Sequence, residues 1–477
     1  MSSKATNLGQ RSPATYGQGM TQSAAGVAAT RRRWGFPEFF VVSQLLAPAV
    51  LFLPGTQPLR VVIRMAPFLL SLGALFFYGK KAFHARLVVP AQKWLLLCSV
   101  WLVLMIFHPT TNSFLAGAAQ ATLYISVLAP MFWAPHIKLT PERLQRLLFI
   151  ILICSGLNSL VGILQVYDPG TWMPKQLSVL VTGQTGGAGG VSYTGPDGRT
   201  IIRPTGLSDN PGAVAGPATA AALLGLIFCF EPMLFWKRLA AALSALAGFT
   251  VIFLTQVRTS LVVACGALLA YGLLLALQRQ KRKAVLLLAF GVLAFGISFF
   301  FAVGLGGQSI ADRFATLLSD TPENVYYEAR GFQIEYGVDT LLFQYPAGAG
   351  LARWGMMRPY FGDENNLESP PIWAELQPNA WVLDGGLVLL LFYSFAVLAN
   401  LRSQIKMVRA ARSPGIPLSS TRVRVSQCAC SILRRPRMRK CVAACAGSCA
   451  YRSRNRCDSS KKARAVFFKP RCSSEMF

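Results

Sequence analysis

Charged side chains are scarce in this sequence, and acidic ones are scarcer than basic ones. Of 477 residues only 14% are charged, with 19 Asp and Glu against 47 Lys and Arg. There are only three histidines, and no cluster of His, Cys, Asp and Glu has metal-ligand spacing, so neither a metal nor a cofactor is expected. The Gly-rich stretches lack the Gly-Lys-Ser/Thr ending of a P-loop, which excludes that kind of nucleotide site.

Hydrophobic residues, in contrast, make up 53% of the chain and gather in long runs. About 18 or more apolar residues suffice for a helix to span a bilayer, so the sequence predicts an all-α polytopic membrane protein with about ten transmembrane helices. No stretch between these runs is long enough for a large soluble domain. The predicted spans are 36–54, 59–78, 92–107, 114–133, 147–166, 212–230, 237–255, 259–277, 284–303 and 379–400.

Basic residues alternate between the connections of these spans. Five connections carry most of the short-loop Lys and Arg: 78–93, 135–146, 235–238, 278–283 and 400–412. By the positive-inside rule all five, and both termini, lie in the cytoplasm. Two long segments, 167–211 and 304–378, then fall on the extracytoplasmic side. The first contains the Gly-rich "TGQTGGAGGVSYTGPDGR" and is interpreted as a linker or a lid.

The two ends of the chain differ from the transmembrane domain, 36–400. Residues 1–35 are small, polar and basic, and are predicted to be a disordered cytoplasmic segment. The tail, 401–477, holds 19 of the basic residues and seven of the eleven cysteines. Such a tail is predicted to be disordered, and since its cysteines lack paired C-x2-C spacing with a histidine, zinc is not expected. The alternative hypothesis is that the tail is frameshifted.

The positive-inside rule disfavours arginines on the outer side, so those predicted to lie there require an explanation. Arg203 precedes the sixth span, Arg258 lies at the start of the eighth, and Arg330 lies in the second outer segment. Arginine binds phosphate oxygens bidentately and keeps its charge when desolvated, so these residues indicate an anion site. The alternative is that each pairs with a local acid, such as Asp209, Glu328 or Glu335, or with lipid headgroups.

Four motifs, in their order along the chain, resemble those of the bacterial O-antigen ligase/polymerase family of multi-span glycosyltransferases. The resemblance covers roughly residues 147–400. Its motifs are "RPTGLSDNPGAVAG", "TQVRTSLVVACGALLAYGLL", "ARGFQIEYGVDTLLFQYPAGAGLARWG" and "NAWVLDGGLVLLLFY". In the first of these, Asn210-Pro211 is interpreted as the start of a helix, with Asn as the cap.

The resemblance implies a GT-C-like arrangement and a glycan donor on undecaprenyl pyrophosphate, used at the outer face of the bacterial inner membrane. It also implies that Arg203, Arg258 and Arg330 hold the pyrophosphate without a metal. The expected partners are this carrier-linked glycan and the lipid bilayer, with polysaccharide export and chain-length proteins as candidates. Because the basic residues lie in short loops and the tail, no nucleic acid is expected.

The sequence departs from the family pattern where ligases carry a histidine before the closing asparagine. Here Gln377-Pro378 precede Asn379, so a carboxylate is the candidate general base, either Glu375 or Asp384. The alternatives are that Glu375 pairs with an arginine and that Asp384 serves as an anion in the first turn of a helix. Without the histidine, the sequence favours a polymerase over a ligase. A transporter of an anionic solute is the alternative function.

Overall fold

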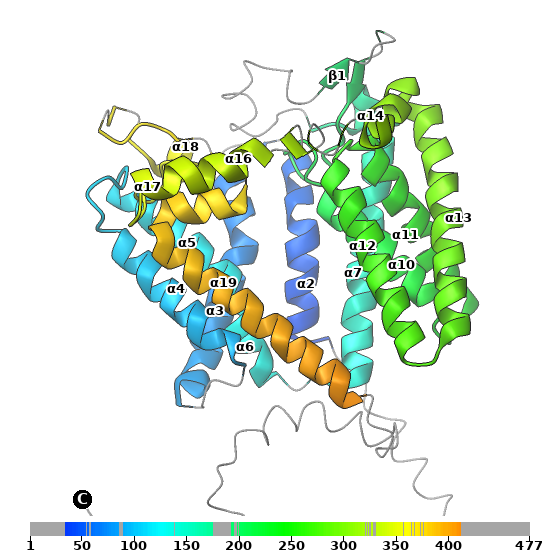
Figure 1. Cartoon of the computed structure of the whole chain (residues 1–477), viewed down its shortest axis with the longest axis horizontal. Coiled ribbons are helices and arrows are strands. Elements are labelled where there is room, and N and C mark those ends of the chain that lie inside the picture. The colour runs from blue at the N-terminus through cyan, green and yellow to red at the C-terminus, as the bar shows by residue number, and fades with distance from the viewer. Residues whose placement is uncertain are drawn as a thin grey trace, which may run out of the picture. The chain divides into compact units, whose positions relative to one another are not determined.

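In the computed structural model of the chain, the helices of Figure 1 account for nearly all the secondary structure of the described residues. These residues are 34–53, 55–56, 59–84, 89–137, 139–174, 192–194, 198, 200–319, 321, 323, 326–327, 331–355, 357–363, 365–366, 368–372, 374 and 376–411. The chain divides into two units, Met1–Ser403 and Gln404–Phe477, and the fold below is that of the first. The predicted N-terminal segment up to residue 33 and the tail from residue 412 lie outside the described residues.

Every one of the ten predicted apolar segments forms a helix in the structure. Among the residues that the structure describes, seven stretches are long and apolar enough to cross a membrane. They are α3 (Arg60–His84), α5 (Phe114–Leu128) continued through α6 (Pro130–Trp133) and η3 (Ala134–His136), α7 (Pro141–Tyr167), α11 (Phe235–Leu254), α12 (Arg258–Leu277), α13 (Lys281–Gly306) and α19 (Gln377–Ala411). Three apolar helices of the described part of the chain are shorter: α2 (Phe36–Leu46) continued by η1 (Ala47–Phe52), α4 (Ala91–Met105) and α10 (Ala215–Cys229).

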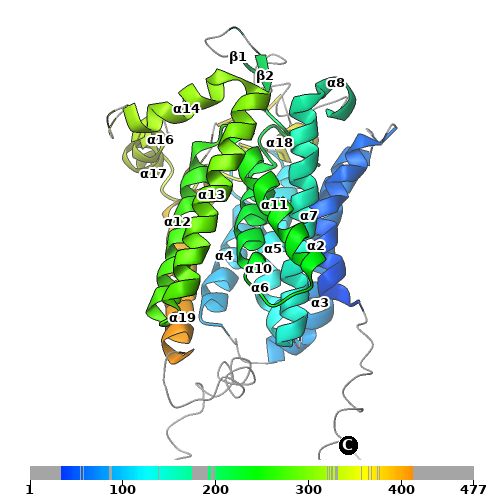
Figure 2. The same cartoon turned by 90° about the vertical axis from the view of Figure 1, so that its right-hand side faces the viewer.

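Small residues bring α10 and α11 into close contact within the group of helices seen in Figure 2. A Cβ on Gly225 of α10 would lie 2.5 Å from the carbonyl oxygen of Ala241, and a Cβ on Gly248 of α11 would lie 2.5 Å from that of Ala218. Glycine and alanine at a helix interface allow such close backbone approach, which supplies van der Waals packing inside a bilayer. The adjoining core joins α10–α13 and α14 (Gln308–Ser319).

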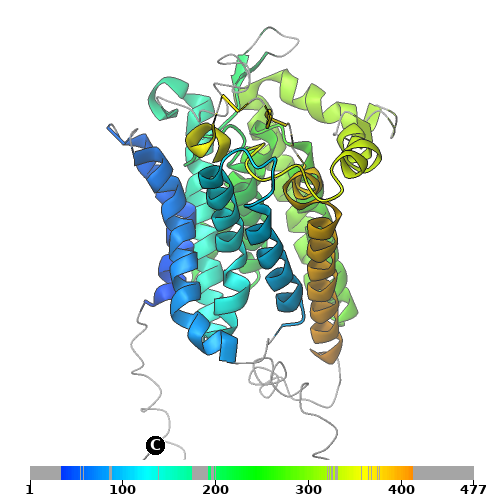
Figure 3. The ribbon, with the colours of Figure 1, turned by 90° about the vertical axis from the view of Figure 1, so that its left-hand side faces the viewer.

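A second core joins α4, α5 and α19, which Figure 3 shows near one another. It contains Leu102, Tyr124 and Leu389, one from each helix. The Trp381 ring stacks on that of Tyr393, twelve residues later and beyond the break in α19 described below, with centroids 4.3 Å apart. These large side chains, in place of the small ones of α10 and α11, hold this part of the bundle together.

Helix α19 is broken at Gly385 and Gly386, where φ/ψ are −162°/16° and 62°/−155°. The segment Pro346–Gly350 lies against the break: the amide of Leu387 donates to Pro346 O (2.9 Å), and the amide of Ala349 donates to Leu383 O (2.6 Å). The indole of Trp101 donates to Gly385 O at 2.8 Å. Backbone groups freed inside a membrane helix must find partners in the protein, and this segment and Trp101 provide them.

The connections predicted for the outer side lie together. At one end, which we call the loop-rich end, contacts join residues 106–113, 203–214, 255–257 and the described residues of 345–372 to one another or to the ends of the same helices. At the opposite end, Arg143 at the start of α7 donates to both carboxylate oxygens of Glu38 at the start of α2, at 2.9 and 2.7 Å. The predicted alternation of helix direction agrees with both sets of contacts.

The predicted start of the sixth helix at Asn210-Pro211 is wrong. Helix α10 begins at Ala215 and its N-cap is Val214, whose side chain cannot cap. Residues 210–214 instead form turns, with Gly212 at a φ of 73° and its amide donating to Pro204 O at 3.1 Å. The hydrogen bonds of the preceding loop keep residues 210–214 in turns, so the helix begins about one turn later than predicted. A short hairpin, β1 (Ser192–Thr194) paired antiparallel with β2 (Thr200–Ile202), precedes Arg203.

Candidate functional site

The loop after Arg203 is fixed by two buried amide side chains of α7. The Gln165 carboxamide oxygen accepts from the backbone amides of Thr205 (2.9 Å) and Gly206 (2.8 Å), and its Nε2 donates to Gly206 O at 2.8 Å. Two turns earlier in α7, Asn158 Oδ1 accepts a hydrogen bond from the backbone amide of Leu207 at 3.0 Å. Gly206 has a φ of 63°, and any Cβ there would overlap Asn158. The "PTGL" sequence therefore locks this loop onto the end of α7.

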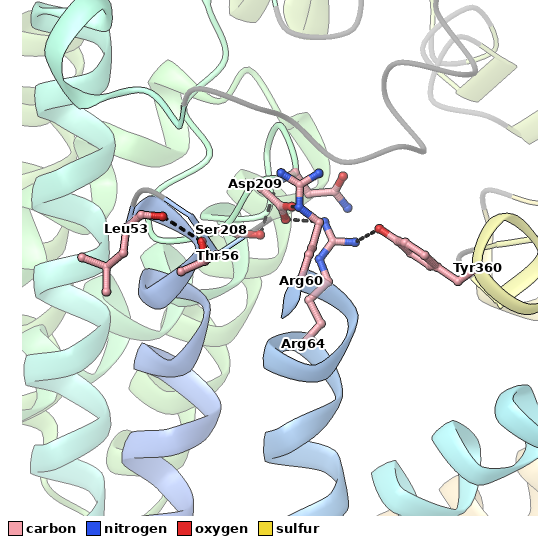
Figure 4. Close-up of polar contacts among 8 residues, drawn as sticks. Leu53, Thr56, Arg60, Arg64, Ser208, Asp209 and Tyr360 are labelled. Atoms are coloured by element: carbon pink, nitrogen blue, oxygen red, sulfur yellow. Dashed lines mark hydrogen bonds and ion pairs between the residues drawn. The ribbon is translucent and has the colours of Figure 1, made fainter. Parts of the chain in front are cut away.

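Asp209, at the end of the same loop, is paired with two arginines of α3. Its carboxylate hydrogen-bonds Arg64 and lies 3.4 Å from Nε of Arg60 (Figure 4). All three side chains are nearly enclosed, with 2% of Asp209, 9% of Arg60 and 11% of Arg64 exposed. Asp209 is one of the acids that the sequence offered as local partners of the outer arginines, and in the structure it forms ion pairs with Arg60 and Arg64.

Arg64 also connects the first outer segment to the second. Its Nη1 lies 3.5 Å from the hydroxyl of Tyr360, which belongs to α18 (Met357–Phe361) (Figure 4). Met357 and Phe361 of α18 pack with Met65 and Ala116. The hydroxyl of Ser113, the N-cap of α5, donates to Phe361 O at 3.0 Å. Helix α18 is thus anchored beside the start of α3.

Arg258 is the first residue of α12 and is half-buried. A Cβ on Gly212 would lie 3.8 Å from Val257 Cγ2, so the turn before Arg258 touches the loop that follows Arg203. The structure thereby brings the segments of two sequence-predicted residues, Arg203 and Arg258, to neighbouring places at the loop-rich end.

Gln256, in the tight turn before Arg258, has two unusual properties. Its φ is 54°, in the left-handed region that a non-glycine residue rarely adopts, and its side chain is 4% exposed. Both atoms of its amide group lack a hydrogen-bond partner among the residues that the structure describes. A strained, unsatisfied polar residue next to a candidate ligand-binding arginine is the pattern expected of a functional turn.

Arg330 and Glu375 lie outside the described residues. The segments that follow both residues are described, and they meet at the start of α19. Helix α16 (Gly331–Tyr336) follows Arg330, and the amide of Asn379 donates from α19 to Gln333 O at 2.7 Å. The π-helical turn η5 (Gly337–Leu341) packs Gly337 against Asn379.

Asp384, the other candidate base, is completely buried. It accepts a hydrogen bond of 2.5 Å from the hydroxyl of Tyr124 on α5. Its other carboxylate oxygen, Oδ1, has no hydrogen-bond partner among the described residues, and neither has the buried indole nitrogen of Trp354. Asp384 lies in the turn before the break in α19, so it is not an anion of the first turn of that helix.

Two further arginines of the second outer segment, Arg353 and Arg358, have structural partners. Arg353 is buried and donates from Nε to Pro370 O (3.1 Å) and from Nη1 to Ala349 O (3.2 Å), and Arg358 donates to Ser369 O at 2.6 Å. Nearby, burial and the charge of Arg353 lower the pKa of His108 below its ordinary value. These residues hold the loops in place.

Sequence reasoning missed Arg60 as part of the charged cluster. The signal was present: Arg60 and Arg64 are four residues apart on a helix and therefore lie on one face. Their partner, Asp209, lies 145 residues away from Arg64 in sequence, and no local pattern connects them.

No protein-family model, curated protein or solved structure matches this chain. Its chemistry must be inferred from the side chains at the loop-rich end. Among the described residues no group of three or more His, Cys, Asp or Glu could hold a metal ion. What the described part of the site offers is guanidinium groups at helix starts, which suits the binding of an anion.

Proposed function

We propose that this chain is a glycosyltransferase that polymerises or ligates an undecaprenyl-pyrophosphate-linked polysaccharide at the outer face of the bacterial inner membrane. The observation that carries the proposal is the gathering of arginine-bearing segments at one end of an apolar helical bundle. Arg60 and Arg64 share Asp209, the loop of Asp209 follows Arg203, and that loop touches the turn of Arg258. In this proposal all ten apolar helices cross the membrane in a GT-C-like arrangement, with both termini cytoplasmic.

The proposed reaction is a direct displacement. A sugar hydroxyl of the acceptor attacks the anomeric carbon of the donor glycan, the bond to the carrier pyrophosphate breaks, and the anomeric configuration inverts. Negative charge then develops on the departing phosphate oxygens, where Arg203, Arg258 and Arg330 would stabilise it in a partly dehydrated site. Guanidinium groups are suited to this because they stay protonated and bind phosphate through two parallel hydrogen bonds.

The acceptor hydroxyl has to lose its proton, and we propose Glu375 or Asp384 as the base. Of these two, Asp384 is enclosed by Tyr124 and other side chains and has no exposed surface. It would have to be uncovered before it could reach a substrate. Glu375 precedes α19, in the segment that joins the second outer segment to the bundle, and we favour it on position.

The break in α19 is an observation that favours the alternative function, a transporter of an anionic solute. Discontinuous helices near charged residues are typical of transporter substrate sites. In this chain, however, Pro346–Gly350 satisfies the backbone of the break and Trp101 covers it. A helix break whose backbone groups are hydrogen-bonded within the protein supports a fixed structural element more than a transport path.

The test is to replace Arg203, Arg258 and Arg330 singly by Lys and by Ala and to follow polysaccharide chain length. The Ala variants should produce short chains or none, and the Lys variants should retain part of the activity, since charge remains but the bidentate fork is lost. Arg282→Ala, at the exposed start of α13 at the opposite end, is the control for loss of one positive charge. Normal polymer from all three Ala variants at normal protein level would reject the proposal, and uptake of an anion by the purified chain in vesicles would favour the transporter.

A further inference from the structure

The turn between α10 and α11, together with the first residues of α11, is set back from the ends of the helices on either side of it. The Phe230 ring, which directly follows α10, lies 5.5 Å from that of Phe290, nine residues after the start of α13. The Lys237 ammonium group lies 5.7 Å from the centre of the Phe149 ring, eight residues after the start of α7. At 1.5 Å per residue these offsets are about 13 Å and about 12 Å. Residues 230–238, which we call the recessed turn, therefore end short of both neighbours (Figure 2).

The recessed turn lies beside apolar stretches of these neighbours. Helix α7 reads "LLFIILIC" from Leu147 onward, and α13 reads "AVLLLAF" up to Phe290. Helix α10 has 15 residues and is about 22 Å long, whereas the hydrocarbon core of a bilayer is about 30 Å thick. A span this short is accommodated by local thinning of the bilayer, which draws lipid headgroups towards its end. The recessed turn is thus a place where the headgroups of one leaflet come close to an apolar helix surface.

Three large apolar side chains of the recessed turn are uncovered by the rest of the protein. Leu234, Phe235 and Trp236 are 72%, 70% and 75% exposed. Phe235 and Trp236 pack on each other, with ring centroids 5.5 Å apart. Exposed aromatic side chains next to an apolar helix end are typical of residues that lie among lipid headgroups and the upper part of the acyl chains. These side chains therefore offer an apolar surface to a lipid.

Two cations follow directly, and neither has an acidic partner. Lys237 is half-buried and Arg238 is exposed. The ion pairs of the described residues include neither of them. Arg238 donates from Nε to the backbone oxygen of Glu231 at 3.1 Å, and Glu231 is the only acidic residue of the recessed turn. At the start of α7, in contrast, Arg143 pairs with the buried carboxylate of Glu38. Cations at the edge of the hydrocarbon are costly without an anion, so this place lacks a negative group.

We infer that the recessed turn binds an anionic phospholipid of the leaflet at the end opposite the loop-rich end. Its phosphate lies on Lys237 and Arg238, and its acyl chains lie against Leu234, Phe235 and Trp236. The guanidinium group of Arg238 has its two Nη atoms left to donate to phosphate oxygens, because only Nε is used by Glu231. The inference rests on the proposed function only in taking α10 to span the membrane, and it concerns the end of the bundle away from the proposed glycan chemistry.

The charge and the apolar surface together select the class of ligand. A soluble anion would neutralise Lys237 and Arg238 but would leave Leu234, Phe235 and Trp236 uncovered. A zwitterionic phospholipid carries its own cation, which competes for its phosphate and is repelled by the two cations of the protein. An anionic phospholipid such as phosphatidylglycerol satisfies both requirements, since basic side chains near a membrane surface attract it.

The experiment measures binding of phosphatidylglycerol to the detergent-purified full chain by native mass spectrometry, with phosphatidylcholine as the comparison lipid. The parent should bind phosphatidylglycerol more tightly than phosphatidylcholine. Replacing Lys237 and Arg238 together by Gln should weaken the tightest phosphatidylglycerol site about tenfold or more. Replacing Lys281 and Arg282 together by Gln is the matched control, because it removes the same charge from the exposed start of α13 at the same end. This control should bind within about twofold of the parent. Trp236→Ala should weaken binding several-fold with the charge unchanged.

Three results would overturn the inference. One is equal phosphatidylglycerol binding by the parent and the variant with Gln at 237 and 238; Arg238→Gln alone, at an exposed position, tests the site if that variant fails to fold. Another is an equal loss of binding in the Lys281 and Arg282 control, which would assign the effect to the overall charge of this end. The third is equal affinity of the parent for phosphatidylcholine. Lipid binding needs no polymerisation, so a selective site in a chain that makes no polymer would reject the proposed function and leave this inference standing.

Discussion

Asp384 of α19 accepts a hydrogen bond of 2.5 Å from the hydroxyl of Tyr124 of α5, and both side chains are buried. The pair lies directly before the break at Gly385 and Gly386, where Trp101 of α4 donates to the backbone. Three helices thus exchange polar contacts around one short stretch of α19. A buried polar network of this kind costs stability when one member is removed, because the others lose a partner.

Replacement of Asp384 separates a catalytic from a structural role. Asp384→Asn keeps the size of the side chain and an oxygen that accepts from Tyr124, but it cannot take a proton from a substrate. If Asp384 only positions α19, the variant should fold and retain most of the polymer output. If Asp384 is the base, output should fall about 100-fold or more while the thermal midpoint stays near that of the parent.

Tyr124→Phe is the partner experiment on the same hydrogen bond. It leaves the carboxylate of Asp384 buried without this donor, so unfolding should become easier by about 1–3 kcal/mol. Thermal unfolding of the detergent-purified protein measures the change. An unchanged midpoint would indicate that the hydrogen bond between Tyr124 and Asp384 adds little to stability.

Gly386 is required by the geometry of the break in α19. Its φ/ψ of 62°/−155° is open essentially to glycine only, and a Cβ would overlap the carbonyl oxygen of Pro346. Gly386→Ala should therefore destabilise the protein by about 3 kcal/mol or more, or prevent its accumulation. Gly296→Ala, in the middle of α13 with no atom within 4 Å of the new Cβ, is the matched control and should be neutral or slightly stabilising. Equal accumulation of both variants would contradict the observed break.

The helices were predictable from sequence because they depend on local composition. Long apolar runs such as that of α7 must lie in a bilayer or a core wherever the rest of the chain goes. The break in α19 was not predictable, because its glycines act through Pro346, which is 40 residues earlier in the chain. The start of α10 was mispredicted for a related reason: the loop before it is held by Gln165, and this contact outweighs the preference of Asn and Pro for the start of a helix.

The candidate site was predictable only in part. Arg258 could be placed next to a helix start because the turn before it is short. Arg60 and Arg64 could be placed on one face of a helix, but the buried carboxylate that joins them comes from Asp209, far along the chain. Charge pairing across a fold follows from the packing of helices, which single-sequence patterns do not contain.

The loop of Asp209 can be tested through Gly206. Gly206 has a φ of 63°, and a Cβ would lie 2.7 Å from Val214 Cγ2 and would overlap the amide of Asn158. Gly206→Ala should lower stability by about 1–3 kcal/mol and reduce polymer output, since the loop that carries Arg203 and Asp209 must move. Gly216→Ala, where the new Cβ has no atom within 4 Å, should leave both unchanged. A loop that tolerates Ala at 206 would not be held by α7 as described.

His108 predicts a pH dependence of stability. Burial and the nearby Arg353 lower its pKa below the ordinary value of 6.5, so the folded protein binds its proton less readily than the unfolded chain. Stability should therefore fall as the pH drops below 6.5 and should not change through this group above 6.5. His108→Asn, which keeps an oxygen near the amide of Thr110, should remove this part of the dependence. Thermal midpoints between pH 5 and pH 8 measure it, and parallel curves for parent and variant would exclude His108 as the cause.

Gln256 offers the sharpest separation of stability from function. The Gln256 amide is buried and has no hydrogen-bond partner in the described part of the chain, which costs free energy. Gln256→Leu, of similar volume, should therefore stabilise the protein by about 1–3 kcal/mol. If the amide exists to contact the substrate beside Arg258, the same variant should make less polymer or shorter chains. Gln92→Leu is the matched control, for which the expected change in stability has the opposite sign. Gln92 is also buried, but it accepts from Val89 N (3.0 Å) and donates to Met131 O (2.7 Å), so its replacement should destabilise the protein. If the Gln256→Leu protein is more stable and makes polymer at the full level, the turn before Arg258 is strained for a reason other than substrate binding. If it is more stable and makes less polymer, the Gln256 amide belongs to the substrate site.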